Sequence, residues 1–391
     1  MTNDLITDAN GIAALCARLD ASERVGLDTE FHAERSYAPR LMVLQLALPG
    51  YTAIVDPLAP GIDLQPLVAA LERVTVVGHA LQSDLKIFAE RFGRVPPKLF
   101  DTQVAASFLG YGMQISLADL VRDLVGVRLA KTQTVSDWST RPLSEKQMEY
   151  LVDDVIHLLP MHDALQQKLS ERGRESWCEQ ECIALANPEK YRFDLRRAYM
   201  KIPGAVRMNR RELGVLAEVV AERDAIAKER DIPPKFVVPD DVVGGIAQLR
   251  PKHLDDLAQL RRLESNARRN FGVRFLAAVE RGEAVPEGEL PERPHRPLGS
   301  DRETLATLLG VAVGEAARDA GLPQGLLVTR AALERAAREA PASAEELAEL
   351  LGLSAWRTAL VVEPLWRLLS GDTRIVVEGY AKGEPKVTLV S

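Results

Sequence analysis

Strand-forming sequence in this chain is concentrated in the first 190 residues, and this uneven distribution limits the fold more than any other feature. Four apolar runs there have strand character, at residues 25–28, 41–48, 51–56 and 74–78. The first three have short connectors, which favour antiparallel neighbours, whereas the fourth follows a helical pattern, which favours a parallel crossover. We therefore expect an α/β domain with a mixed sheet over residues 1–190.

From about residue 207 onward the sequence is helical in pattern and rich in Ala, Leu, Glu and Arg. Three segments recur at an offset of 90 residues without a gap, namely 230–233 with 320–323, 236–238 with 326–328, and 255–260 with 345–350. Such a repeat predicts a duplicated helical domain. We place the first copy at residues 206–282 and the second, which includes the C-terminal tail, at 300–391.

The segment between the two copies, residues 283–299, has the composition of a linker. It holds four prolines among glycines and charged residues. The tail at 374–390 carries two strand-like runs around Lys382 and Gly383, which predict a hairpin. The chain is therefore expected to contain one α/β domain and two small helical domains.

The net charge of this 391-residue chain is −7, which by itself disfavours nucleic-acid binding. Divalent cations bound to a carboxylate cluster would remove the objection, because they reverse the local sign of charge. Residues 206–281 hold 15 Lys and Arg against 12 Asp and Glu, whereas residues 300–370 hold 7 against 10. Either this difference in charge reflects random sequence drift on solvent-exposed surfaces, or only the first copy contacts nucleic acid. The arginine pairs at 261–262 and 268–269 would share one face of a continuous helix.

The sequence gives no indication of a membrane or secreted protein. No run approaches the roughly 20 apolar residues that span a bilayer, and the first residues lack the pattern of a secretory signal. Three cysteines, Cys16, Cys178 and Cys182, are too few for a disulfide framework. We therefore expect a cytoplasmic protein.

Asp28 and Glu30 form the first candidate site, at the end of a strand-like run. Alternation along a strand places both carboxylates on one face. Two like charges this close are costly unless a cation lies between them. The alternative interpretation is an ordinary polar strand end, and Asp-x-Glu alone, among 56 acidic residues, does not decide between the two.

Asp84 follows the strand-like run at 74–78 and lies in the first turn of a predicted helix. It is a second candidate ligand, although the helix dipole favours acidic residues in first turns without any ligand. His79 lies between the strand and this helix. A metal-binding or acid role is open to His79, but a structural, fully hydrogen-bonded histidine is the simpler expectation.

Tyr150 and Asp154 lie four residues apart in a predicted helix and therefore share a face. The start of the helix is well defined, because Ser144 and Gln147 match a capping box. Asp153 is rotated by about 100° from Asp154 and should point elsewhere. The alternative interpretation is an amphipathic helix with a half-buried tyrosine.

Taken together, a strand and two helices supply four carboxylates and a phenol, from Asp28, Glu30, Asp84, Asp154 and Tyr150. Oxygen ligands of this kind suit Mg²⁺ or Mn²⁺. Two such ions about 3.5–4 Å apart can stabilise the attacking and leaving oxygens of a phosphoryl displacement. Histidine and cysteine are too sparse for a zinc site, and no Gly-x-x-x-x-Gly-Lys-Ser/Thr loop indicates an NTPase.

The order Asp-x-Glu, Asp, Tyr-x-x-x-Asp resembles the three motifs of DEDDy-class 3′→5′ exonucleases, which have the DnaQ-like, ribonuclease H-like fold. The wider sequence resembles the ribonuclease D family: residues 27–31 are similar to its first motif, and 131–138 with 141–143 to its third region. The duplicated helical unit resembles the HRDC domain. The resemblance implies an α/β, mixed-sheet exonuclease domain followed by two all-α HRDC domains.

The resemblance also implies a role for each candidate residue. Asp28 would bridge two divalent ions, and Glu30 and Asp154 would hold the ion on the nucleophile side. Asp84 would support the other ion through water. Tyr150 would orient the attacking water, and the products would be nucleoside 5′-monophosphates.

Two further parts of the family-like sequence bear on the site. Residues 151–153 read Leu-Val-Asp where the family suggests small residues, so we expect altered helix packing behind Tyr150. Asp101 and Lys131 also lie in family-like sequence, and we expect them to support the site without binding metal.

The leading hypothesis is a 3′→5′ exoribonuclease that acts on tRNA precursors and other structured RNAs with a single-stranded 3′ end. The first helical copy would hold the body of the RNA. A DNA exonuclease of the same class and a non-catalytic nucleic-acid-binding scaffold are the alternatives. Oligomeric state is open, with a monomer as the simplest expectation.

Overall fold

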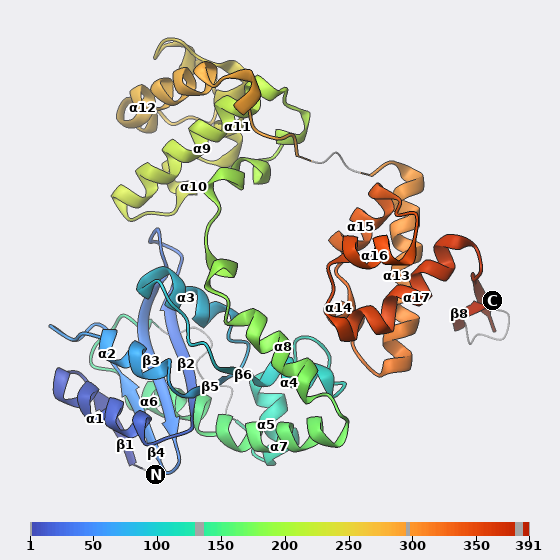
Figure 1. Cartoon of the computed structure of the whole chain (residues 1–391). Coiled ribbons are helices and arrows are strands. Elements are labelled where there is room, and N and C mark those ends of the chain that lie inside the picture. The colour runs from blue at the N-terminus through green and yellow to red at the C-terminus, as the bar shows by residue number, and fades with distance from the viewer. Residues whose placement is uncertain (1, 130–136, 295–297, 380–385, 391) are drawn as a thin grey trace.

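The structure is a computed structural model that describes residues 2–129, 137–294, 298–379 and 386–390. Its first domain, blue to green in Figure 1, contains a six-stranded sheet in the order β1-β4-β3-β2-β5-β6. The β2–β3 and β3–β4 pairings are antiparallel and the other three are parallel, which confirms the predicted mixed sheet. The strands are β1 (Thr2–Ile6), β2 (Arg24–His32), β3 (Arg40–Leu48), β4 (Tyr51–Val55), β5 (Thr75–Gly78) and β6 (Leu99–Asp101).

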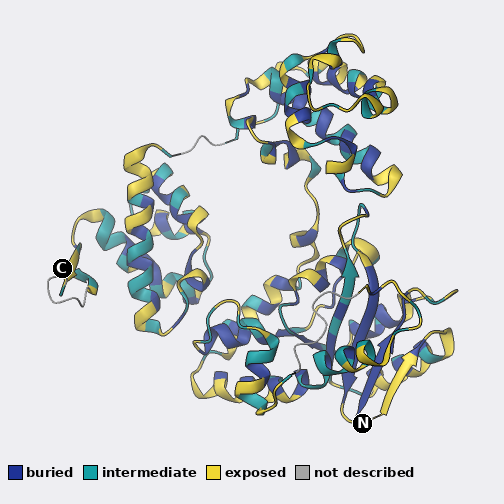
Figure 2. Cartoon of the chain, turned by 180° about the vertical axis from the view of Figure 1, so that it is seen from behind, coloured by how far each residue is buried: buried dark blue, intermediate teal, exposed yellow. Residues whose placement is uncertain are grey.

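The two edge strands, β1 and β6, are additions to the four that the sequence predicts. β1 reads Thr-Asn-Asp-Leu-Ile and is exposed at all but its last residue, so it has no apolar run (Figure 2). β6 has only three residues. Both strands are stabilised by pairing with the backbone of β4 and β5, which local sequence does not reveal.

Helices cover both faces of the sheet, and β3 and β4 are therefore buried along nearly their whole length. One face packs against α1 (Ala9–Asp20), α2 (Gln65–Leu71) and α3 (Gln82–Phe92). The other packs against α4 (Thr102–Phe108), α5 (Leu117–Val125), α6 (Glu145–Ile156) and α7 (Leu158–Glu171), with α8 (Glu175–Leu185) beyond them. None of the helices in the described ranges is long and apolar enough to span a bilayer.

The predicted repeat is visible in the helix bounds, which match at the 90-residue offset through the first three helices of each copy. The pairs are α9 (Arg210–Arg230) with α13 (Ser300–Ala320), α10 (Pro234–Val237) with α14 (Gln324–Leu327), and α11 (Asp240–Leu249) with α15 (Arg330–Glu339). Both long helices end at a residue with positive φ, Asp231 and Gly321. The sequence repeat is therefore a structural repeat.

The two copies diverge after these helices. The first continues with the 3-10 helix η4 (Asp256–Gln259) and α12 (Ser265–Ala284), the second with α16 (Ala344–Leu351) and α17 (Ala355–Ser370). Because α12 begins at Ser265, the arginines at 261–262 precede it, and the continuous helix considered for the two arginine pairs does not form. In the tail, β7 (Arg374–Glu378) and β8 (Lys386–Val390) pair as the predicted antiparallel hairpin.

Specific contacts join each helical copy to the sheet domain. Tyr37, in the connection between β2 and β3, donates its hydroxyl to Asp224 of α9 at 2.9 Å. On the second copy, the Trp356 ring of α17 stacks on Trp177 of α8 with centroids 4.8 Å apart. Arg357 adds an ion pair to Glu181 at 2.5 Å. The three bodies of Figure 1 are therefore linked by side-chain contacts as well as by the chain.

Candidate metal centre

The central strand β2 presents two of the predicted ligands. Asp28 is paired with Gln45 of β3, and Glu30 with Val43. The register shifts between Glu30 and Phe31, so the regular pairing ends where the pair of acids ends. Alternation places the two carboxylates on the same face of the sheet, the face that α6 covers.

Helix α6 brings the third acid to this face. Its start has the predicted capping box, since the Ser144 hydroxyl accepts from the Gln147 amide and the Gln147 side chain accepts from the Ser144 amide. Leu151 and Val155 are buried against the sheet. Gly26 allows this close approach, because a methyl group there would lie 3.2 Å from the Val155 carbonyl oxygen. Burial of one side of α6 thus directs its opposite side along β2.

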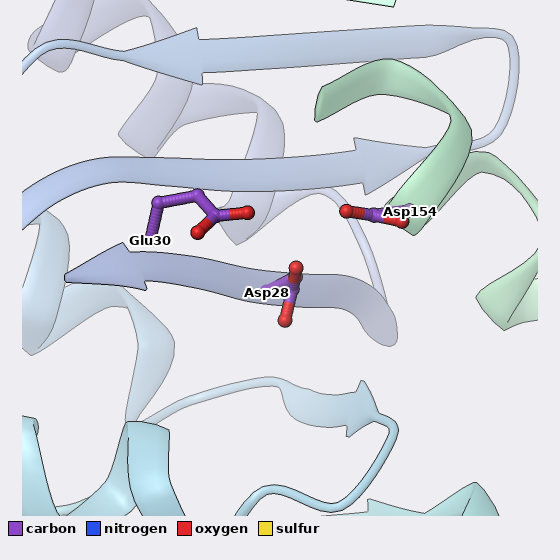
Figure 3. Close-up of side chains that lie close together, drawn as sticks. All are labelled: Asp28, Glu30 and Asp154. Carbon is purple, nitrogen blue, oxygen red and sulfur yellow. The ribbon is translucent and has the colours of Figure 1, made fainter. Parts of the chain in front are cut away.

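Asp28, Glu30 and Asp154 converge as the sequence predicts. One carboxylate oxygen from each can be chosen so that all three lie within 4.8 Å of one another. Figure 3 shows the three carboxylates gathered beside β2, two from the strand and one from the helix. The ligand set is therefore all oxygen and drawn from two elements that are 124 residues apart in sequence, counting from Glu30 to Asp154.

Electrostatics at the cluster favour a bound cation. Burial and the neighbouring acids raise the pKa of Asp28 well above its usual range, and raise that of Glu30 to about 8. Burial raises the pKa of Asp154 to about 7. The ion pairs of the described chain involve other acids, so no Lys, Arg or His neutralises this group. Such a donor set fits hard divalent ions, which would supply the missing positive charge.

Asp84 lies next to the cluster without belonging to the group of three. It is 5% exposed at the start of α3, on the opposite face of the sheet from α6. The Thr29 hydroxyl donates to its carboxylate. Burial raises the pKa of Asp84 to about 7, and its charge in turn raises the pKa of Asp28. The fourth acid thus contacts β2 through Thr29, a residue that the sequence did not single out.

Tyr150 lies one helical turn before Asp154 and is hydrogen-bonded to it. Burial and the surrounding acids raise the pKa of the phenol, which therefore stays protonated at neutral pH. Its ring lies 5.7 Å from that of Trp138, centroid to centroid. Leu151, where the family suggested a smaller residue, is buried with Trp138 and Val43 in a small separate core. The space behind Tyr150 is thus filled by larger side chains than the family suggested.

The segment before α6 is anchored by Arg141. Its Nε lies 2.7 Å from Oδ2 of Asp56, and Nη2 lies 2.8 Å from Oδ1, a bidentate pair. Nη1 donates to the Trp138 carbonyl at 2.7 Å. This anchor gives Arg141, in the third motif region, a structural role. Lys131, which the sequence suggested as a supporting residue, lies outside the described residues.

His79 and Asp101 have structural partners. Nε2 of His79 is 3.0 Å from the Ile115 carbonyl and Nδ1 is 2.9 Å from the Thr102 hydroxyl, so both ring nitrogens are occupied. Asp101, only 2% exposed, accepts from the amides of Ala80 and Leu81 at 3.1 and 2.8 Å and so holds the turn before α3. The structural interpretation of His79 is the one that this geometry supports.

The cysteines do not form a metal site. Cys178 and Cys182 are buried on α8, and hydrogen bonding to Cys182 together with burial raises the pKa of the Cys178 thiol. Cys16 lies on α1, and burial raises its pKa as well. Thiols held in the protonated form are poor ligands.

Comparison with known proteins places these residues in a family context. A family described as 3′-5′ exonuclease matches residues 3–170, and the HRDC domain family matches residues 212–279. The Ribonuclease D of Nitrobacter hamburgensis is 37% identical over 378 residues, covering 96% of this chain and 97% of that protein. The Ribonuclease D of Acidiphilium cryptum is 35% identical over 381 residues, covering 96% and 95%.

A solved structure with the same domain arrangement is the crystal structure of Escherichia coli RNase D, described as an exoribonuclease involved in structured RNA processing. It superposes with a TM-score of 0.84 at 30% identity, covering 95% of this chain and 99% of that one. A structure from Bifidobacterium adolescentis, at 22% identity and a TM-score of 0.69, shares the fold.

Proposed function

The chain belongs to the ribonuclease D family of exoribonucleases, and we propose that it removes nucleotides from RNA 3′ ends with two divalent ions, Mg²⁺ or Mn²⁺. The observation that carries this proposal is the convergence of Asp28, Glu30 and Asp154 within 4.8 Å, with no cationic side chain to neutralise them in the described chain. Asp84 would complete the ligand set from the other face of β2. The products would be nucleoside 5′-monophosphates.

Each residue of the site has a defined part in this proposal. Asp28 would be shared by both ions, with Glu30 and Asp154 on one and Asp84 supporting the other through water. When bound, the ions would lower the pKa of the attacking water and stabilise charge on the phosphate. Tyr150 would orient that water with its hydroxyl. Because its pKa is raised, the phenol stays protonated at neutral pH and cannot act as the base.

The proposed substrates are tRNA precursors and other structured RNAs with a single-stranded 3′ end. A single-stranded 3′ end would have to reach the cluster beside β2, and its recognition would rest on backbone and stacked bases. The first helical copy, with its excess of three positive charges, would hold the RNA body. The second copy would be a further HRDC domain with a structural task. We place this activity in the cytoplasm.

Incubation with a tRNA precursor labelled at either its 3′ or its 5′ end tests the proposal. We expect 3′-label to be released first as mononucleotide, in the presence of Mg²⁺ and not of EDTA. Asp28→Asn should abolish release, whereas Asp153→Asn, which alters a neighbouring carboxylate outside the cluster, should retain it. Full activity of Asp28→Asn would remove the metal assignment.

Two alternatives are outcomes of the same assay. A matched DNA oligonucleotide degraded as fast as RNA would favour a DNA exonuclease, because the 2′-hydroxyl is the systematic difference between the two. Absence of both Mg²⁺-dependent degradation and Mn²⁺ binding would favour a non-catalytic scaffold. The family assignment and the intact acidic cluster both support the exoribonuclease over these alternatives.

A further inference from the structure

Gln45 is a buried polar residue whose side chain has no hydrogen-bond partner. It lies on β3 and is 0% exposed. Neither its amide nitrogen nor its amide oxygen makes a hydrogen bond with the rest of the described chain. A buried amide without partners destabilises the fold, because its donor and acceptor groups lose their hydrogen bonds to water on folding. Such a residue in a native protein calls for a partner that the polypeptide itself does not provide.

The position of Gln45 is next to the acidic cluster. In the β2–β3 ladder Gln45 is the direct cross-strand partner of Asp28. Directly opposite residues of an antiparallel pair place their side chains on the same face, with Cβ atoms about 5 Å apart. That face is the one on which Asp28, Glu30 and Asp154 converge.

The neighbours of Gln45 along its own face of β3 are apolar, and the hydroxyl of Thr52, diagonally across on β4, makes no hydrogen bond with it. On the same face of β3, Val43 packs with Leu151 and Ala47 packs with Val155. Gln45 is the single polar residue of β3 after Arg40. An aliphatic residue would fit this layer at lower cost, so burial alone does not explain an amide here.

The chemistry of a carboxamide suits the edge of a metal centre. It offers two donors and one acceptor without adding charge to a group of acids that already repel one another. A further carboxylate at this position would increase the repulsion. A hydrocarbon would offer no hydrogen bond to the ligands or to water around an ion.

We infer that Gln45 is a positioning residue of the metal centre, whose amide hydrogen-bonds the water held beside Asp28 when divalent ions are bound. The inference rests on the proposed function. The hydrogen bond to this water would offset the free-energy cost of burying the Gln45 amide. The conformation of the Asp28 carboxylate and of the water next to it would then depend on β3 as well as on β2.

Gln45→Met is the variant that tests this role, because methionine has a similar length and needs no hydrogen bond. We expect its melting temperature in EDTA to rise, since an unsatisfied buried group is removed. We expect its affinity for Mn²⁺, measured by calorimetry without RNA, to fall by roughly 10–100-fold, the range for residues that orient metal ligands. RNA hydrolysis at subsaturating Mg²⁺ should fall with it.

Thr52→Val is the matched control. Thr52 is also fully buried, lies on the adjacent strand β4, and has a hydroxyl with no hydrogen-bond partner in the described chain. This variant should also gain stability but keep the Mn²⁺ affinity and activity of the unaltered chain. The opposite movement of stability and metal affinity is therefore specific to Gln45.

The possible results separate the two proposals. If Gln45→Met binds Mn²⁺ as tightly as the unaltered chain, the amide makes no contribution to metal binding and the inference is overturned. It is also overturned if Gln45→Met is less stable in EDTA, because the amide would then serve the fold itself. If the unaltered chain binds no Mn²⁺, the proposed function fails as well.

Discussion

At the scale of single residues, the site is a set of acids whose ionisation is held back by burial and by their own proximity. Asp28, Glu30 and Asp154 lie close enough to share a cation, and burial raises the pKa of each. Without a metal, protons therefore compete for the same oxygens near neutral pH. Metal affinity should consequently increase with pH, because the ligands must be deprotonated to bind.

The stability of the metal-free protein should fall as pH rises from about 4.5 to about 8. The pKa of Glu30 is raised from 4.5 to about 8, and those of Asp84 and Asp154 from 3.8 to about 7. In this window the folded chain retains protons that the unfolded chain has lost, so the free energy of unfolding decreases with pH.

Thermal unfolding in EDTA, compared with saturating Mg²⁺ across that pH range, measures this effect. Added Mg²⁺ should cancel most of the decrease, because it replaces the protons as the neutralising charge. Asp154→Asn should flatten the decrease in EDTA. A metal-free melting temperature that rises steadily between these pH values would contradict the assigned electrostatics.

Tyr150→Phe should separate orientation of water from metal binding. The phenol is hydrogen-bonded to Asp154 but is not one of the gathered carboxylates. We expect the turnover number to fall by about 100-fold, the scale for loss of one preorganised hydrogen-bond donor. Mn²⁺ affinity by calorimetry should change little, and a large loss of affinity would assign Tyr150 to the ligand set instead.

At the scale of secondary-structure elements, some features follow from local sequence and others do not. The capping box of α6 and the four inner strands are local patterns, and from them alone Asp28, Glu30 and Asp154 could be assigned to their strand and helix. β1 is polar and exposed, so only its pairing with β4 makes it a strand. The capping of the turn before α3 by Asp101, 20 residues away, is likewise a tertiary contact.

The same limit explains which site residues the sequence did not reveal. Thr29 is unremarkable between two acids until the fold brings Asp84 against its hydroxyl. Gln45 lies in an apolar run, and its importance depends on the β2–β3 register, which sequence does not specify at single-residue precision. A buried amide in an otherwise aliphatic strand was the available signal.

Arg141→Gln should destabilise the sheet domain through the segment before α6. Arg141 forms a bidentate pair with Asp56, and their side chains are only 23% and 8% exposed. Removing one partner of such a pair leaves a buried charge and costs roughly 3–5 kcal/mol. Urea unfolding followed by circular dichroism would measure the loss.

Arg122→Gln is the control for this prediction. Arg122 pairs with Asp119 and Asp123 on the surface, where solvent screens the pairs, so its loss should change the stability little. Equal destabilisation by the two variants would show that the Asp56 pair has no special role in holding the segment.

At the scale of the whole molecule, the two helical copies use equivalent positions differently. Trp356 and Arg357 of the second copy contact α8, whereas the equivalent residues at the 90-residue offset are Asn266 and Ala267. Trp356 is 6% exposed and also lies against Phe108, with centroids 5.4 Å apart. The duplication has thus yielded one copy that docks through Trp356 and Arg357 and one that has Asn266 and Ala267 at these two positions.

Trp356→Ala should release the second copy from the sheet domain. A buried tryptophan at the centre of a contact typically contributes about 2 kcal/mol or more to docking. We expect small-angle X-ray scattering to show a larger radius of gyration for this variant, while Asn266→Ala stays compact. Identical scattering profiles would mean that the aromatic stack does not hold the two bodies together.

The most direct test of the central claim is anomalous diffraction from crystals soaked in Mn²⁺. We expect two anomalous peaks beside Asp28, one bounded by Asp28, Glu30 and Asp154 and the other on the side of Asp28 toward Asp84. Peaks confined to other surfaces, or no peak at Asp28 in crystals that bind Mn²⁺ elsewhere, would contradict the assignment of these acids as the metal centre.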